Sequence, residues 1–160
     1  MFCKHGVKWL YRLDTNFSWQ SKLAIQQDYA FMDKDGTVRL ILEQGGKITV
    51  TNGYAWNGCS PKFCCCDILF GTPDGVVDAR TEKPKTYYAS LVHDAMYQFL
   101  PDGLPVTRRD ADKCFLLLMQ DTDFRPRLIY YMVVRLLGGI VWRLERSSRK
   151  TKGTAVQLPY

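Results

Sequence analysis

The stretch KTYYASLVHDAMYQF, residues 85–99, decides what kind of fold this chain adopts. Its apolar residues recur at helical spacing, and the Pro-Asp-Gly sequence at residues 101–103 ends the pattern. We therefore predict a helix over residues 85–99. His93 and Asp94 are adjacent inside this otherwise apolar segment, so a titratable imidazole would enter the protein interior together with an acid.

Two more helices are predicted after this one, over residues 107–121 and 126–147. Thr107 followed three residues later by Asp110 resembles a capping box with the shorter acid. In the last helix an apolar stripe is interrupted by Arg135, which favours an amphipathic core helix over a bilayer span of about 20 residues. The members of that stripe are Ile129, Met132, Val133, Leu136, Leu137, Ile140 and Leu144.

The residues before the first helix predict a small antiparallel meander and then a long loop. Strand-like runs over residues 22–31 and 38–42 flank the turn at residues 33–36, which predicts a hairpin. Residues 47–50 return as a third strand, and residues 54–84 are rich in Gly and Pro. The predicted fold class is therefore α+β, with an N-terminal antiparallel β-meander followed by a three-helix core.

Length and composition fit one globular domain with less regular ends. A chain of 160 residues, 46% hydrophobic and 24% charged, can bury one core, and this composition excludes a disordered or collagen-like protein. We predict residues 1–21 to be an N-terminal docking arm, residues 22–147 a single α+β domain, and residues 148–160 a basic tail. The net charge of +6 favours acidic partners such as phosphate-bearing membranes or nucleic acid. We expect no signal peptide and no transmembrane span.

The helix over residues 85–99 carries the candidate chemistry. His93 and Tyr97 lie one helical turn apart on the same face, whereas Asp94 is rotated by about 100°. If the next helix packs antiparallel, Asp110 or Asp112 near its start can reach His93, fix its tautomer and raise its basicity. This arrangement predicts a base for water activation. The same spacing also fits a second interpretation, in which His93 is a core histidine bonded to Asp112 and Asp94 pairs locally.

Asp94 is not needed for the pair between His93 and an acid of the next helix, so its carboxylate could bind a hard cation. Calcium accepts oxygen ligands at flexible geometry, including backbone carbonyls. The tight turn WNGCSP, residues 56–61, offers such carbonyls next to Gly58. The sequence therefore predicts a calcium site that is half backbone.

Several blocks of sequence resemble a family of small phage and prophage proteins catalogued as a domain of unknown function. The blocks are GYAWNGCSP at 53–61, ASLVHDAMY at 89–97, R-x-x-A-D-x-x-F-x-x-x-M at 108–119, then Tyr131 and VRLLG at 134–138. They follow in the family's order and cover roughly residues 22–142. This resemblance implies a viral or prophage origin and no settled activity.

A second, more distant resemblance is mechanistic. An H-D-x-x-Y helix, preceded by an N-G-C-S loop and followed by R-x-x-x-D-x-x-F, is similar to the prokaryotic and parvoviral phospholipase A2 type. The resemblance implies a phospholipase A2-like helical core in which the histidine activates water against the ester at the middle glycerol carbon. It implies that His93 is the base, that Asp112 orients His93, and that Tyr97 donates a hydrogen bond to that acid.

The same resemblance implies a metal site and shows two departures. Asp94 would hold calcium, and Asn57 and Gly58 would line the calcium loop. Ser90 stands where that type has a half-cystine, and additional residues separate the loop from the helix.

Three functional hypotheses follow from these patterns. The first is a phage-encoded, tail-associated virion protein that hydrolyses host-membrane phospholipid esters with calcium. The second is a non-catalytic structural component of the tail that docks with other phage structural proteins. The third is a nucleic-acid-binding accessory protein, which is least favoured because the basic residues are scattered and no binding motif is present. Either virion role implies a location in the particle, or in the host cytoplasm before assembly.

Overall fold

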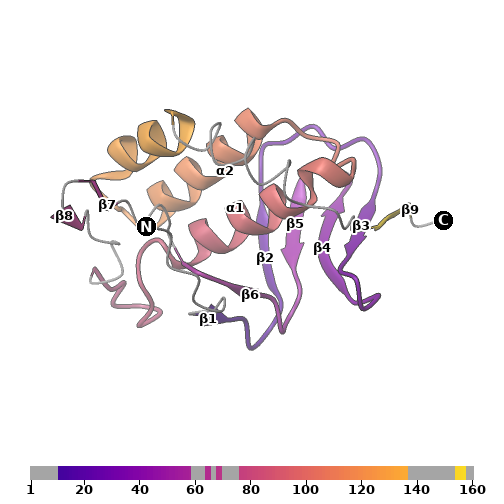
Figure 1. Cartoon of the computed structure of the whole chain (residues 1–160), viewed down its shortest axis with the longest axis horizontal. Coiled ribbons are helices and arrows are strands. Elements are labelled where there is room, and N and C mark those ends of the chain that lie inside the picture. The colour runs from indigo at the N-terminus through magenta and orange to yellow at the C-terminus, as the bar shows by residue number, and fades with distance from the viewer. Residues whose placement is uncertain (1–10, 59–63, 66–67, 70–75, 137–153, 158–160) are drawn as a thin grey trace.

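The computed structural model describes residues 11–58, 64–65, 68–69, 76–136 and 154–157, and it has the predicted α+β fold (Figure 1). The strands are β1 (Tyr11–Arg12), β2 (Phe17–Gln20), β3 (Tyr29–Met32), β4 (Val38–Glu43), β5 (Lys47–Val50), β6 (Ala55–Trp56), β7 (Cys64–Cys65), β8 (Ile68–Leu69) and β9 (Thr154–Gln157). The helices are α1 (Tyr87–Phe99), the short 3-10 helix η2 (Leu100–Asp102), α2 (Arg108–Asp121) and a third helix that includes residues 127–136.

Five strands form the main sheet, in the order β2-β5-β4-β3-β9, and all neighbours are antiparallel. The predicted β3–β4 hairpin is confirmed, but its first strand begins at Tyr29 and not at residue 22. At its turn, Asp33 Oδ1 accepts the backbone N–H groups of Asp35 (3.0 Å) and Thr37 (3.1 Å), and Asp33 Oδ2 accepts a 2.6 Å hydrogen bond from Arg39 Nε. Burial alone would raise the pKa of Asp33, but these hydrogen bonds outweigh burial and lower it.

The sheet includes strands from both the predicted N-terminal arm, residues 1–21, and the predicted basic tail, residues 148–160. β2 pairs with β5 at one edge, and Leu13 is only 4% exposed, so the protein core already begins within residues 11–21. β9, from the predicted basic tail, pairs with β3 at the other edge. Phe17 and Trp19 alternate with polar residues over four positions only, which is too short a run for the period of a strand to stand out in the sequence. Residues 1–10 and 148–153 lie outside the described residues.

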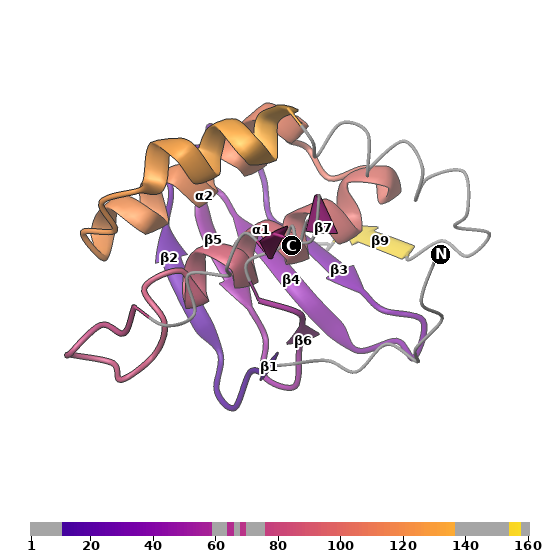
Figure 2. The ribbon, with the colours of Figure 1, turned by 60° about the vertical axis from the view of Figure 1, so that its left-hand side comes forward.

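Helix α1 lies between the sheet and the other two helices (Figure 2). The side chains of Leu91, Val92, Met96 and Phe99 are completely buried there. Thr122, directly after α2, donates a 2.8 Å hydrogen bond from its hydroxyl to the carbonyl of Lys85, just before α1. The end of α2 therefore lies against the start of α1, which is the predicted antiparallel packing.

The third helix has a different orientation about its axis from the one we predicted. Ile129, Met132 and Leu136, placed in the core by the predicted stripe, are 67%, 53% and 68% exposed. Val134 is 5% exposed instead, and Tyr130 packs against the core. The prediction is wrong for the three exposed residues because both faces of this helix are apolar and periodicity alone does not choose between them. Leu137, Ile140 and Leu144 lie outside the described residues. Within the described ranges, no helix has both the length and the hydropathy to cross a bilayer.

Candidate active site

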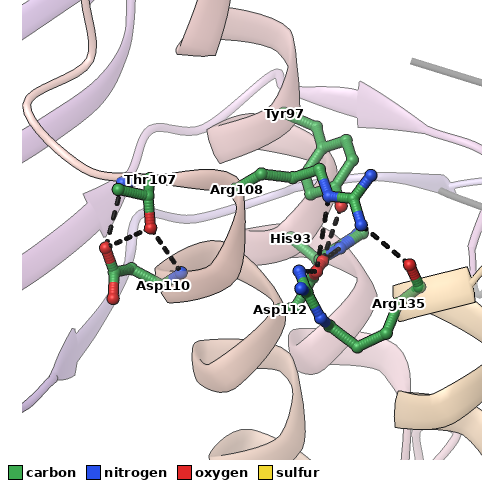
Figure 3. A network of polar contacts seen from close by, with 7 residues as sticks. All are labelled: His93, Tyr97, Thr107, Arg108, Asp110, Asp112 and Arg135. Carbon is green, nitrogen blue, oxygen red and sulfur yellow. Dashed lines mark hydrogen bonds and ion pairs between the residues drawn. The ribbon is translucent and has the colours of Figure 1, made fainter. Parts of the chain in front are cut away.

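The carboxylate of Asp112 is the centre of the candidate site and is fully buried. Its Oδ1 atom lies 3.0 Å from Nε2 of His93 and accepts a 2.6 Å hydrogen bond from the Tyr97 hydroxyl (Figure 3). α1 supplies His93 and Tyr97 from successive turns, and α2 supplies the acid. The predicted hydrogen bond between His93 and an acid of the next helix is therefore present.

Asp110, the other acid that the sequence left open, has a different task. Its Oδ2 atom accepts a 3.0 Å hydrogen bond from the backbone N–H of Thr107, and the Thr107 hydroxyl accepts one of 3.2 Å from the Asp110 backbone N–H. This is the predicted capping box, with both reciprocal bonds present. Figure 3 shows Asp110 turned toward Thr107 and away from the Asp112 cluster. The cap uses Asp110 and leaves Asp112 to face α1.

Two arginines that the sequence analysis did not assign to the site complete the shell around Asp112. Arg135, on the third helix, donates a 2.7 Å hydrogen bond from Nη1 to Asp112 Oδ2. Arg108 Nε lies 3.8 Å from the same oxygen, and Arg108 Nη2 donates a 2.7 Å hydrogen bond to the Arg135 carbonyl. The signal was available, because an arginine within an apolar helix calls for a buried acid as its partner. Asp112 thereby joins all three helices.

The protonation states follow from these contacts. Burial alone would raise the pKa of Asp112, but hydrogen bonds from His93, Tyr97 and Arg135 outweigh it and hold the pKa below its ordinary value. Burial and the bond to Asp112 both raise the pKa of Tyr97. Asp112 is therefore ionised and Tyr97 is a neutral donor at neutral pH.

A carboxylate can only accept, so His93 must donate its Nε2–H to Asp112. In the neutral ring this leaves the lone pair on Nδ1, which lies 3.7 Å from Asp94 Oδ1, beyond hydrogen-bond length. Burial would lower the pKa of His93, but the bond to Asp112 and the negative charge of Asp94 outweigh burial and raise it. The ring thus offers a basic nitrogen of defined direction.

The surroundings of the ring are apolar on one side and only slightly exposed on the other. The ring centroids of Tyr97 and Phe115 lie 4.2 Å and 5.1 Å from that of His93. His93 remains 9% exposed, and the side chain of its neighbour Asp94 is 35% exposed. The imidazole is therefore largely buried, next to a carboxylate that is partly exposed.

Two of the predicted calcium ligands, Asn57 and Gly58, follow a strand that contacts α1. The indole N–H of Trp56 donates a 3.1 Å hydrogen bond to Ser90 Oγ, one turn before Asp94, so the end of β6 lies against the first half of α1. Directly after Trp56, the Asn57 side-chain oxygen is buried without a hydrogen-bond partner, and Gly58 has φ of +76°. Within the described part of the chain, Asp94 forms no hydrogen bond or ion pair with Asn57 or Gly58, and its ionic contact is with His93. Oxygen donors of this kind suit calcium, and the site stays a prediction.

Among the described residues, no three His, Cys, Asp or Glu side chains form a cluster that could hold a metal ion. No family model, curated protein or solved structure matches the chain.

Proposed function

We propose that this protein hydrolyses phospholipid esters, with His93 as the general base. The observation that supports the proposal is the pair of contacts on one ring. Nε2 of His93 is fixed by the buried carboxylate of Asp112, while Nδ1 faces the partly exposed carboxylate of Asp94 at 3.7 Å, beyond hydrogen-bond length. A base that is oriented through one nitrogen, with no hydrogen bond on the other nitrogen, suits water activation.

The chemical steps use the residues already described. His93 Nδ1 takes a proton from water as the water oxygen attacks the ester carbonyl carbon, which forms a tetrahedral oxyanion. The imidazolium is stabilised by the adjacent negative charge of Asp112, which Tyr97 and Arg135 hold in place. When the ester C–O bond breaks, His93 returns its proton to the departing alkoxide, so that a fatty acid and a lysophospholipid are released.

Calcium is the cofactor of this proposal, and Asp94, Asn57 and Gly58 are the residues that would hold it. A bound calcium ion would supply positive charge close to the developing oxyanion. The unpartnered side-chain oxygen of Asn57 is the feature of this structure that fits such an ion.

The proposed setting is a bacteriophage particle, in the tail, facing the phospholipids of the host membrane. Its support is the resemblance of the motif blocks to phage and prophage proteins. Mass spectrometry of purified particles tests this setting, and absence of the protein from them would reject it.

A structural role in the virion is the competing function, and one observation favours it. Asp112 is fully buried and contacts three helices, so the network could serve packing alone. An assay of fatty-acid release from phospholipid vesicles separates the two functions. We expect release by the wild type, with a loss of about 10²–10⁴-fold in His93→Ala, the range typical of a general base. His5→Ala, which changes the chain's other histidine, is the matched control and should keep its activity. If the wild type releases no fatty acid where a bacterial phospholipase A2 does, the enzymatic function is lost.

A further inference from the structure

The third helix presents an apolar surface to solvent. Leu128, Met132 and Leu136 follow each other at intervals of four, and Ile129 lies beside them, so the four share one face of the helix. They are 62%, 53%, 68% and 67% exposed in that order. We call these four residues the outer stripe. Elsewhere in the described part of the chain, the large hydrophobic side chains that are exposed are Val76 and Val77.

The outer stripe faces away from the core because the opposite face of the helix is fixed. Val134 is buried, Tyr130 packs on Phe124 with ring centroids 5.3 Å apart, and Arg135 reaches inward to Asp112. Figures 1 and 2 show this helix on the outside of α2, on the side away from the sheet. Rotating the helix to bury the stripe would remove Arg135 from a fully buried carboxylate, which is a costly change.

The sequence around the outer stripe is strongly basic. Residues 124–152 contain eight basic residues and a single acid, Glu145. Arg135 is paired with Asp112, and the other seven basic residues are Arg125, Arg127, Arg143, Arg146, Arg149, Lys150 and Lys152. An exposed apolar helix face combined with cationic charge is complementary to an anionic phospholipid surface, in which phosphate groups overlie hydrocarbon.

We propose that the outer stripe binds this protein to an anionic phospholipid bilayer, with the third helix lying in the interface. This inference rests on the proposed function and names the physical form of its substrate, a charged bilayer surface in place of dissolved lipid. Leu136 immediately follows Arg135, so the surface that meets the bilayer belongs to the same helix turn that holds Asp112 in place.

Co-sedimentation with vesicles of ether-linked phospholipids tests the proposal on the wild-type chain. Ether lipids contain no ester, so binding is measured without hydrolysis. We expect the wild type to sediment with vesicles that contain phosphatidylglycerol and much less with vesicles of phosphatidylcholine alone. Leu128→Ser combined with Met132→Ser should lower the partition coefficient at least about tenfold, because two exposed apolar side chains no longer enter the interface.

Val76→Ser combined with Val77→Ser is the matched control, since it removes two exposed apolar side chains from another surface. Equal loss of binding in both double variants, or no loss in the stripe variant, would overturn the proposal. So would a wild-type dimer in lipid-free solution that dissociates in the stripe variant, because a second copy would then be the occupant.

The two proposals fail separately. Binding to ether lipid without any release of fatty acid from ester lipid rejects the hydrolase and keeps the membrane surface. Hydrolysis of a short-chain, water-soluble phospholipid ester without vesicle binding keeps the hydrolase and rejects the membrane surface.

Discussion

Nη1 of Arg135 lies 2.7 Å from Oδ2 of Asp112, and the opposite oxygen of that carboxylate holds His93. A single buried charge thus connects the outermost helix with the candidate base. Arg135, which is distant from His93 in the sequence, thus helps to hold the carboxylate that orients the ring.

We expect Arg135→Met to lower the free energy of unfolding by about 1–3 kcal/mol, because the buried Asp112 loses a charged hydrogen bond while Arg135 itself is partly exposed. Urea denaturation measures the change. Arg125→Met, at an exposed position just before the same helix, is the control and should stay within about 0.5 kcal/mol of the wild type. Equal stability of the two variants would mean that the ion pair does not anchor Asp112.

The ionisation of His93 gives a prediction that needs no substrate. The structure places the pKa of His93 above its ordinary value because Asp112 and Asp94 outweigh the effect of burial. We expect Asp112→Asn to lower this pKa, since the ring stays buried while its negatively charged partner is gone. The chain has two histidines, so NMR titration of the ring protons resolves His93 once His5→Gln assigns the other signal. An unchanged His93 pKa in the asparagine variant would contradict the hydrogen bond.

Acid should destabilise the protein through Asp112. Its folded pKa is lowered, so its contribution to stability is complete above the ordinary carboxyl pKa of about 3.9 and is lost as pH falls through the folded value. We expect the free energy of unfolding of the wild type to fall more steeply in this range than that of Asp112→Asn. Asp33→Asn serves as a comparison, because Asp33 also has a lowered pKa but lies in the β3–β4 turn. Parallel curves for the wild type and Asp112→Asn would refute the prediction.

Calcium should stabilise the folded chain if Asp94 is a ligand. A cation that binds only the native state raises the unfolding temperature, and the increase grows with the logarithm of the cation concentration above its dissociation constant. We expect added calcium to raise this temperature for the wild type, a chelator to reverse the increase, and Asp94→Asn to abolish it. Asp35→Asn, in an exposed turn, should respond like the wild type. A calcium response that persists in Asp94→Asn would remove this residue from the metal site.

Local spacing explains how much of the site could be predicted from sequence. His93 and Tyr97 are one helical turn apart on the same face. Because the connection to the next helix is short, that helix packs antiparallel, and an acid near its start lies close to His93. Either Asp110 or Asp112 could have been the partner of His93. Asp110 is bonded to Thr107 in the capping box, which leaves Asp112 for His93. Arg135 approaches from a third helix across a distance in sequence of 23 residues, and no local pattern specifies that contact.

The same limit applies to the fold. The β3–β4 hairpin has a polar turn between two mainly apolar strands of the sheet, and it was predicted. β2 and β9 are four residues each and pair at the sheet edges, where little apolar pattern is needed. The third helix is apolar on two sides, so its orientation depends on the ion pair of Arg135 and not on its hydropathy.

The hydrogen bond from Trp56 to Ser90 affects the redox conditions under which the chain can fold. It holds the end of β6 against the first half of α1 through a buried contact of 3.1 Å. An indole and a hydroxyl need no oxidant to form their bond, and thiol reductants do not break it. This junction can therefore form in a reducing compartment and persist unchanged in an oxidising one.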